Sequence, residues 1–189
     1  MKHMKRPSII TALSGLLLAA GLFTACEKDA RDEVYGNINI FMPQATLGGN
    51  RYAVPQGLDS ATFNYRIDQA GDKVNVILGV ARSGQQGADA FSVNILANAD
   101  TITKMINTGA LDASNVVMPA NLYSLPQSIA VDAGKTANTF YLSLNKTQLK
   151  TYAGKKVALG ISINQPSNYS ISPGADRVIV IVDVNALKL

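Results

Sequence analysis

The sequence has few of the side chains on which most active sites and metal centres depend. It contains one histidine, His3, one cysteine, Cys26, and no tryptophan. Its only two glutamates, Glu27 and Glu33, lie just after that cysteine. A single cysteine excludes a disulfide within the chain, and the usual zinc sites need several cysteine or histidine ligands. These shortages argue against a catalytic function and against a metal-binding function.

The first 25 residues have the layout of a bacterial secretory signal peptide. Lys2, Lys5 and Arg6 give a basic start, and residues 8–25 follow without a charge. A membrane-spanning helix needs about 20 predominantly apolar residues. This run is slightly short and contains Gly15 and Gly21, so a spanning anchor is the weaker interpretation.

The signal peptide ends in a sequence that resembles a lipobox. Residues 23–26 read FTAC, and cleavage before Cys26 would make this residue the lipidated N-terminus of the mature chain. An ordinary signal peptide followed by a spare thiol is the alternative. Residues 26–33, CEKDARDE, form an acidic tether that resembles the surface-export signal of Bacteroidetes lipoproteins. We therefore expect a lipid-anchored protein of the outer membrane at the cell surface, with the periplasmic face as the alternative.

Removal of residues 1–25 from the 189 leaves 164, enough for one domain, which we expect at residues 34–189. The removed segment carries three of the 17 Lys and Arg and none of the 13 Asp and Glu, so the formal charge falls from +4 to +1. We therefore expect no nucleic-acid partner. The mature chain would also have no histidine and no free thiol. This excludes Ser-His-Asp and Cys-His sites, and a glycosidase would have to use aspartates alone.

The mature chain is predicted to be an all-β protein. Short runs that alternate apolar and polar residues are separated by turns rich in Gly, Asp, Asn and Ser, at a spacing of roughly ten residues that is typical of a sandwich or barrel. The last run, DRVIVIVDV, places Val178, Val180 and Val182 on one face and is apolar on the other face too, at Ile179, Ile181 and Val184, so both faces should be covered. The predicted strands are 34–42, 61–68, 73–82, 91–97, 127–134, 136–144, 155–164 and 176–184.

Two short helices interrupt this pattern. Residues 101–109, TITKMINTG, are predicted to form a helix with Asp100 as its N-cap and Gly109 at its end. A second short helix is predicted in NKTQLKTYAG, capped by Asn145 and closed by Gly154. Both should cover the sandwich.

Several longer stretches resemble a Bacteroidetes lipoprotein family, the domain of unknown function seventeen thirty-five. They include VPQGLDSATFNY, YAGKKVALGISIN and the run from LPQS to AGKT, and the resemblance covers residues 34–187. It implies an immunoglobulin-like antiparallel β-sandwich, usually the first module of a lipoprotein involved in glycan use. Such a module is often followed by a carbohydrate-binding or hydrolase domain. The family has no established catalytic residues, so none is transferred.

Candidate contact residues are few. Aromatic rings form the usual platform for sugars, and Tyr123 and Tyr169, each in a loop-like stretch near a proline, are the best candidates for glycan contact. The other tyrosines are expected to pack in the core or at strand edges. The stretches DSA and DTI resemble the O-glycosylation sequon of Bacteroidetes, which marks Ser60 and Thr101 as acceptor candidates, although Asp100 also has the capping interpretation. No aspartate-rich loop suggests a calcium site.

The resulting prediction is a non-catalytic, lipid-anchored protein of the cell envelope that needs no metal or other cofactor. Its partners would be the membrane, through the lipid on Cys26, and a polysaccharide or an outer-membrane lipoprotein or transporter. It would act as an accessory glycan-binding or scaffolding module of a glycan-uptake system. The alternative is a structural or adhesion subunit resembling fimbrillins, which polymerise by strand donation.

Overall fold

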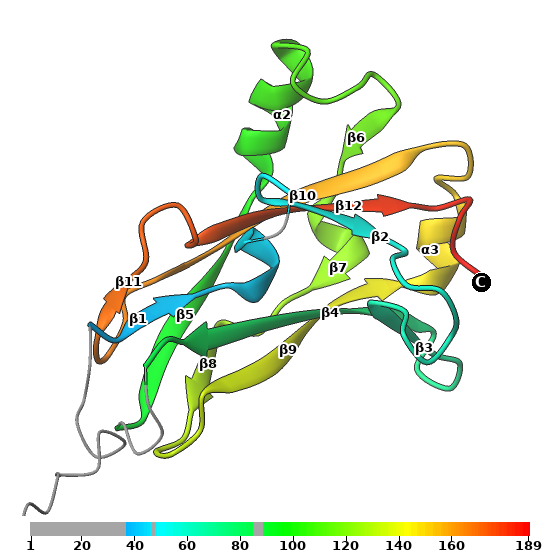
Figure 1. Ribbon diagram of the computed structural model, residues 1–189. Helices are drawn as coiled ribbons and strands as arrows, with labels where there is room; N and C mark the ends of the chain where they lie inside the picture. Colours follow the sequence, from blue (N-terminus) through cyan, green and yellow to red (C-terminus); the bar gives the residue numbers. More distant parts are fainter. Residues whose placement is uncertain (1–36, 47, 85–88) are drawn as a thin grey trace, which may run out of the picture. The chain divides into compact units, whose positions relative to one another are not determined.

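The computed structural model describes residues 37–189, except 47 and 85–88. The described chain folds as an all-β sandwich of two six-stranded sheets (Figure 1), which confirms the predicted fold class. The predictions for the signal peptide at 1–25 and the tether at 26–33 concern residues that lie outside the described part. Within the described part, no helix has the length and apolar character needed to span a bilayer.

The first sheet has the strand order β11-β1-β4-β9-β7, with β3 paired to β4 beside β1. Its two long members, β4 and β9, are antiparallel over their whole length. The gap along the edge of β4 between β1 and β3 is closed by backbone and side-chain groups, among them the Tyr52 hydroxyl, which donates to the Ile77 carbonyl (3.1 Å). The strands are β1 (Asn39–Phe41), β3 (Tyr65–Asp68), β4 (Lys73–Arg82), β7 (Tyr123–Ser124), β9 (Ala137–Asn145) and β11 (Ser170–Ile171).

The second sheet has the order β2-β12-β10-β5-β8, with β6 paired to β10 beside β5. The chain crosses from the first sheet to the second through a short 3-10 helix, Pro43–Thr46, which connects β1 to β2. The strands are β2 (Arg51–Val54), β5 (Phe91–Asn98), β6 (Asn115–Val117), β8 (Ser128–Val131), β10 (Lys156–Asn164) and β12 (Arg177–Asp183).

Alternation of side chains explains how the two sheets share one core. In β4 the even-numbered residues from Val74 to Val80 are fully buried, and in β12 Val178, Val180 and Val182 face them from the other sheet. Because successive side chains of a strand point to opposite faces, one apolar residue in two is enough to close the sandwich. Val184 belongs to this core, so its predicted place on the opposite face of the last strand is wrong.

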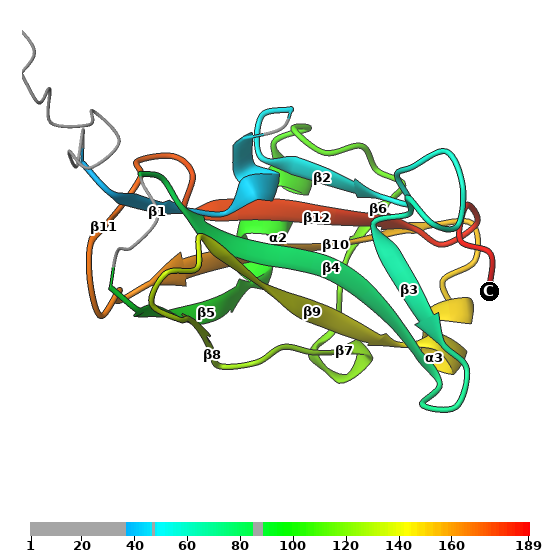
Figure 2. The ribbon, with the colours of Figure 1, turned by 60° about the horizontal axis from the view of Figure 1, so that its bottom comes forward.

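The outer face of the second sheet is covered by a helix, α2 (Ala99–Asn107), which connects β5 to β6. Ile102 is fully buried in a second, smaller cluster with Ala158 of β10 and Ile179 of β12, which confirms that both faces of β12 are covered. Gly160 permits the close approach of the helix start, because a Cβ there would lie 2.9 Å from the Asn98 carbonyl oxygen. Figure 2 shows α2 on the far side of the sandwich, behind the broad ribbons of β4 and β9.

The helix ends agree only in part with the prediction. The N-cap of α2 is Asn98, not Asp100, which lies in the first turn. The Asn98 side chain donates to Ser162 Oγ (2.8 Å) and makes no capping bond, because β5 continues directly into the helix. Gly109 follows the helix with a positive φ of 72°, as expected. In α3 (Lys146–Lys150) the predicted cap is confirmed, since Asn145 Oδ1 accepts from the Gln148 amide (2.7 Å).

The family resemblance implied an antiparallel sandwich, but the observed sandwich is not purely antiparallel. Three strand pairs are parallel: β1 with β11, β6 with β10 and β2 with β12. Each of these pairs includes a strand of two to four residues, and its two strands are joined by long stretches of chain that contain other elements. A tight hairpin forces the two strands that it joins to be antiparallel. Since no such hairpin joins the strands of these pairs, the short strand can run parallel to its partner.

Candidate functional site

The two outer faces of the sandwich differ. The helix α2 covers part of the second sheet, whereas no helix among the described residues lies over β3, β4 and β9 of the first sheet (Figure 2). Several outward side chains of β4 and β9 are therefore at least partly exposed. They include Asn75 and Ile77 in β4 and Tyr141 and Ser143 in β9, and we call this surface the Tyr141 face.

Tyr141 is the most exposed aromatic side chain of this surface. It is 47% exposed, while its neighbours Phe140 and Leu142 point into the core. It lies directly across from Ile77 in the register of β4 and β9, and next to this pair Ser143 Oγ donates to Asn75 Oδ1 (2.7 Å). A ring held on a flat strand surface and flanked by amide and hydroxyl groups suits a ligand that has both an apolar face and hydroxyl groups.

A hollow of about 190 Å³ adjoins the Tyr141 face at the β7 edge of the sheet. Ser143 belongs to both, so the two form one surface. Tyr123 lines this hollow and packs its ring partly against the core, in register with Leu144. We call it the Tyr123 hollow. It is lined by Gly71, Lys73, Asn121, Leu122, Tyr123, Ser124, Ser143, Leu144 and Asn145.

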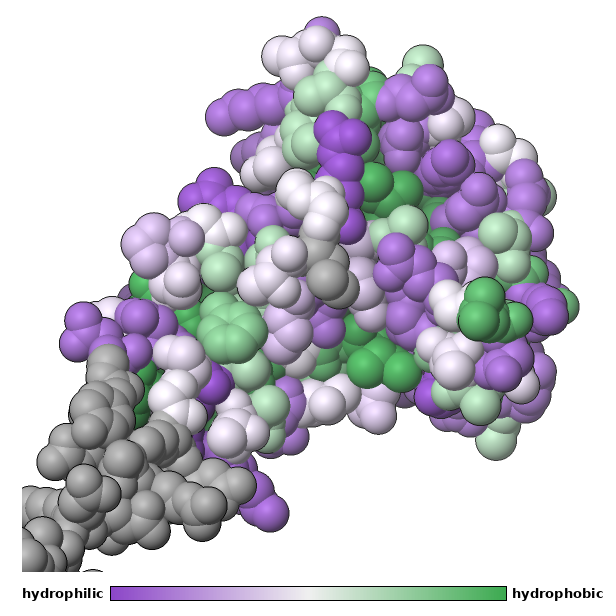
Figure 3. All heavy atoms as spheres, in the orientation of Figure 1, coloured by the Kyte–Doolittle hydropathy of each residue, from purple (hydrophilic) through white to green (hydrophobic). Residues whose placement is uncertain are grey.

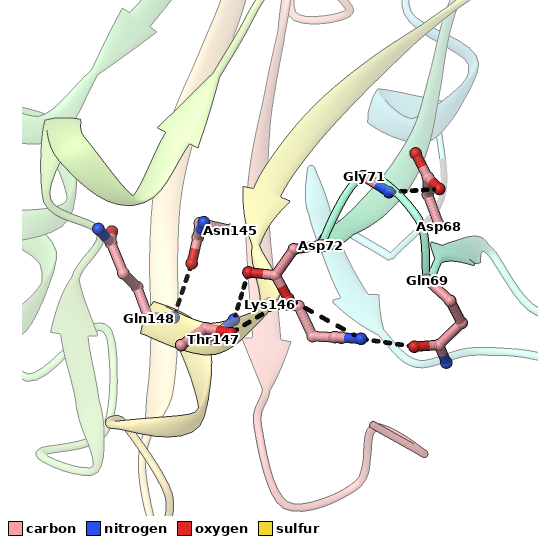
Figure 4. A network of polar contacts seen from close by, with 8 residues as sticks. All are labelled: Asp68, Gln69, Gly71, Asp72, Asn145, Lys146, Thr147 and Gln148. Atoms are coloured by element: carbon pink, nitrogen blue, oxygen red, sulfur yellow. Dashed lines mark hydrogen bonds and ion pairs between the residues drawn. The ribbon is translucent and has the colours of Figure 1, made fainter.

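A network of polar contacts holds one wall of the Tyr123 hollow (Figure 4). The turn between β3 and β4 contacts the start of α3 through Asp72, which accepts from the Thr147 amide (3.3 Å) and from Thr147 Oγ1 (3.1 Å). The Lys146 ammonium group lies between Gln69 Oε1 and Asp72 Oδ1, at 3.8 Å from the latter. These contacts join two wall segments that are far apart in sequence, and so they fix the shape of the hollow before any ligand binds.

The structure places the second predicted tyrosine at the other edge of the same sheet. Tyr169 precedes β11, which lies at the opposite end of the strand order from β7. Its ring packs edge-to-face against Phe91, with centroids 6.2 Å apart, and its hydroxyl donates to the Asp89 carbonyl (3.4 Å). Tyr123 and Tyr169 therefore do not form one contact surface, and each remains a separate prediction for glycan contact.

The two predicted O-glycosylation acceptors differ in accessibility. Ser60 is exposed in the loop between β2 and β3, which also carries the fully exposed Leu58. Thr101 is half-buried in the first turn of α2. Exposure favours Ser60, and both assignments stay predictions. Hydrogen bonds from the amide and hydroxyl of Thr62 hold the pKa of the neighbouring Asp59 below its usual value, despite a small opposing effect of desolvation.

Thr101 also lines a second hollow, of about 230 Å³, between α2 and strands β10 and β12. A wider depression of about 490 Å³ continues from it and shares Asp176 and Arg177, whose side chains form an ion pair (3.3 Å). Among the described residues, no aromatic side chain lines either one. Figure 3 shows the apolar residues on the side facing the reader in separate areas among polar ones.

The described residues contain no group of three or more His, Cys, Asp or Glu side chains placed to hold a metal ion. Hydrogen bonds from Ser114 lower the pKa of Asp112, and burial raises the pKa of Tyr52.

Sequence reasoning missed Tyr141, although a signal for it was present. In TANTFYLSL the apolar residues Phe140, Leu142 and Leu144 alternate with Tyr141 and Ser143, which assigns the tyrosine to the opposite face from the core. The pattern does not indicate whether that face is covered, because coverage depends on which sheet the helices pack against.

Residues 38–170 match the model of a family described as "-like, N-terminal domain". No curated protein matches the sequence.

Similar folds occur in solved structures of Bacteroides proteins. A candidate carbohydrate-binding protein from Bacteroides ovatus is 11% identical with a TM-score of 0.53, over 76% of this chain and 36% of that one. A two-domain protein of unknown function from Bacteroides fragilis is 10% identical with a TM-score of 0.50, over 95% and 51%. A protein of unknown function from Bacteroides ovatus is 13% identical with a TM-score of 0.50, over 78% and 52%. At these identities the similarity shows the fold alone. The matched part of this chain spans between about a third and about half of the length of these neighbours.

Proposed function

We propose that this chain, which belongs to the family of "-like" N-terminal domains matched over residues 38–170, is a non-enzymatic module that binds a glycan on its Tyr141 face. The observation that carries the proposal is the half-exposed ring of Tyr141 on a sheet face that no described helix covers, next to a hollow lined by amide and hydroxyl groups. The C–H face of a sugar packs on such a ring while its hydroxyl groups bond to the flanking polar side chains.

The context of the proposal comes from the resemblance to the domain of unknown function seventeen thirty-five and from a structural neighbour described as a candidate carbohydrate-binding protein. Together they support an accessory role in glycan uptake. The shortage of histidine, cysteine and glutamate in residues 34–189 supports binding without turnover. Turnover of any glycan by the pure protein would refute this part.

The test is a glycan array probed with the wild-type protein and with two variants of one position. Tyr141→Thr removes the ring and keeps a residue that suits a strand, whereas Tyr141→Phe keeps the ring and removes the hydroxyl. A tyrosine side chain buries about 200 Å² when fully covered. Covering the exposed half contributes about 2.5 kcal/mol at 25 cal/mol per Å². We expect Tyr141→Thr to weaken binding by roughly tenfold or more, after the cost of ordering the ligand, and Tyr141→Phe to keep most of the affinity.

Two further variants locate the contact. Tyr123→Phe keeps the packing of the half-buried ring and tests the hydroxyl in the hollow, and Tyr169→Phe does the same at the opposite edge of the sheet. Weaker binding in Tyr169→Phe alone would move the glycan site to the β11 edge. Equal affinity of wild type and Tyr141→Thr for every bound glycan would refute the Tyr141 face as the site. A silent array, together with an outer-membrane transporter that co-purifies with the intact protein, would shift the role to scaffolding.

We also propose that the protein is held at the outer membrane, facing the cell surface, by lipid on Cys26. The basic start, the uncharged run and the acidic tether in residues 1–33 support this assignment. The matched variant is Cys26→Ala, compared with wild type by detergent fractionation with and without an inhibitor of the lipoprotein signal peptidase. Protease digestion of intact cells tests exposure. An unchanged partition of Cys26→Ala into membranes would refute the lipid anchor.

A further inference from the structure

The Tyr123 hollow carries an uneven charge. Of the residues that line it, only Lys73 is charged. Lys73 is an exposed residue at the start of β4, across from Asn145 of β9 in the strand register, and so it lies on the same outward face as Tyr141. A ligand in this hollow therefore meets a cation at one end and neutral polar groups elsewhere.

Two carboxylates that adjoin Lys73, one across the strand pair and one in sequence, are engaged in the turn between β3 and β4. Asp68, its cross-strand neighbour in β3, accepts the Gly71 amide (2.9 Å), and Asp72 faces Thr147 and Lys146 (Figure 4). Two ion pairs join described residues, Lys146 with Asp72 and Arg177 with Asp176. Lys73 takes part in neither. Within the described part of the chain its ammonium group is thus free to pair with a group on a ligand.

The neutral groups of the hollow add hydrogen-bond donors beside this cation. Asn145 uses its side-chain oxygen to cap α3, which leaves its amide NH₂ as the group offered to a ligand. The hydroxyl group of Ser124 and the amide of Asn121 supply further donors. A cation with several neutral donors and no lining carboxylate matches an anionic oxygen group.

We infer that the Tyr123 hollow recognises a saccharide that carries a carboxylate or sulfate group, with Lys73 as the residue that selects for the charge. The inference rests on the proposed glycan binding and adds its substrate class. One sugar unit of the saccharide stacks on the Tyr141 face while the anionic group of another unit enters the hollow.

Matched neutral and acidic saccharides test this inference by titration calorimetry with the full protein. One pair is an oligogalacturonate and its methyl ester, and the other is a sulfated oligogalactan and its unsulfated form, so that the carboxylate and the sulfate are tested separately. We expect at least one acidic form to bind roughly fivefold more tightly than its neutral partner at low salt, the scale of one exposed ion pair. This preference should shrink at high salt, because the charges are then screened.

Three lysine variants assign the preference to its position. Lys73→Gln should abolish it, and Lys73→Arg should retain it. Lys135→Gln, at an exposed lysine in the turn between β8 and β9, should leave it unchanged and so controls for net charge. Equal affinity for the neutral and acidic forms, or the same loss of preference in Lys73→Gln and Lys135→Gln, would overturn the inference and leave glycan binding in place. Absence of binding to neutral and acidic saccharides alike would overturn the proposed function itself.

Discussion

Replacement of Val180 by aspartate should unfold the sandwich at neutral pH. Val180 lies in the middle of β12 on its core side and is fully buried. It is in register with Leu159 of β10 and Tyr52 of β2, both of which belong to the same core. Because β12 lies between these two strands, an aspartate at this position has no short path to solvent.

The expected loss follows from three contributions. Removal of the buried valine side chain costs about 1.5–3 kcal/mol. A carboxyl group in such surroundings has its pKa raised by about 3–5 units, so it is largely neutral at pH 7, and holding it neutral there costs about 4 kcal/mol. Its unpaired polar atoms add about 1–3 kcal/mol. The sum of about 7–10 kcal/mol matches the whole free energy of unfolding of a typical domain.

The measurement is urea unfolding followed by far-ultraviolet circular dichroism of a soluble form that begins at residue 34. Wild type should give a β-dominated spectrum and one cooperative transition. Val180→Asp should lack the transition at pH 7. Since the folded pKa of the new carboxyl is raised above its unfolded value of about 3.9, the destabilisation is smallest below that value and grows as the pH rises from there to the folded pKa. The variant should therefore regain part of its stability near pH 4.

Two matched variants complete the test. Val180→Ala, which introduces no charge, should cost only about 2–3 kcal/mol and keep a cooperative transition. Ile181→Asp changes the next residue, which is half-buried on the α2 side and has a shorter route to water, so its cost should be smaller than that of Val180→Asp. A Val180→Asp variant that unfolds at pH 7 within about 1 kcal/mol of wild type would contradict the burial of β12.

Two further predictions concern the helix and the β2–β3 loop. Ile102→Ala should destabilise the protein by about 2–5 kcal/mol and increase amide hydrogen exchange more in α2 than in β4; equal increases in both would contradict a separate cluster under α2. The Asp59 pKa is lowered below 3.8 by hydrogen bonds from Thr62, so the loop should keep its protection down to that pH and lose it as the pH falls through the folded pKa. Hydrogen exchange of residues 55–64 measures this change in protection. In Asp59→Asn the protection should no longer depend on pH in this range. An unchanged pH profile in that variant would assign the change to another group.

The amino-acid sequence by itself determined the strongly periodic parts of the protein. β4 matches the predicted strand 73–82, and β10 and β12 agree with their predictions to within one residue at each end. These strands carry enough alternating apolar residues for the pattern to indicate the buried face without any partner. The Asn145 cap was predictable for the same reason, because it depends on a contact three residues away.

Only the tertiary structure decided the features that depend on distant partners. The strands Arg51–Val54, Asn115–Val117, Tyr123–Ser124 and Ser170–Ile171 are too short to carry a period, and each forms because a strand remote in sequence offers it an edge. The same dependence governs the candidate site. Alternation already placed Tyr141 away from the core, but it stays accessible because α2 packs on the other sheet, and Lys73 meets Tyr123 because β4, β7 and β9 share one sheet. Local sequence sets which side chains point outward, whereas the packing of remote segments sets which of them remain uncovered and lie together.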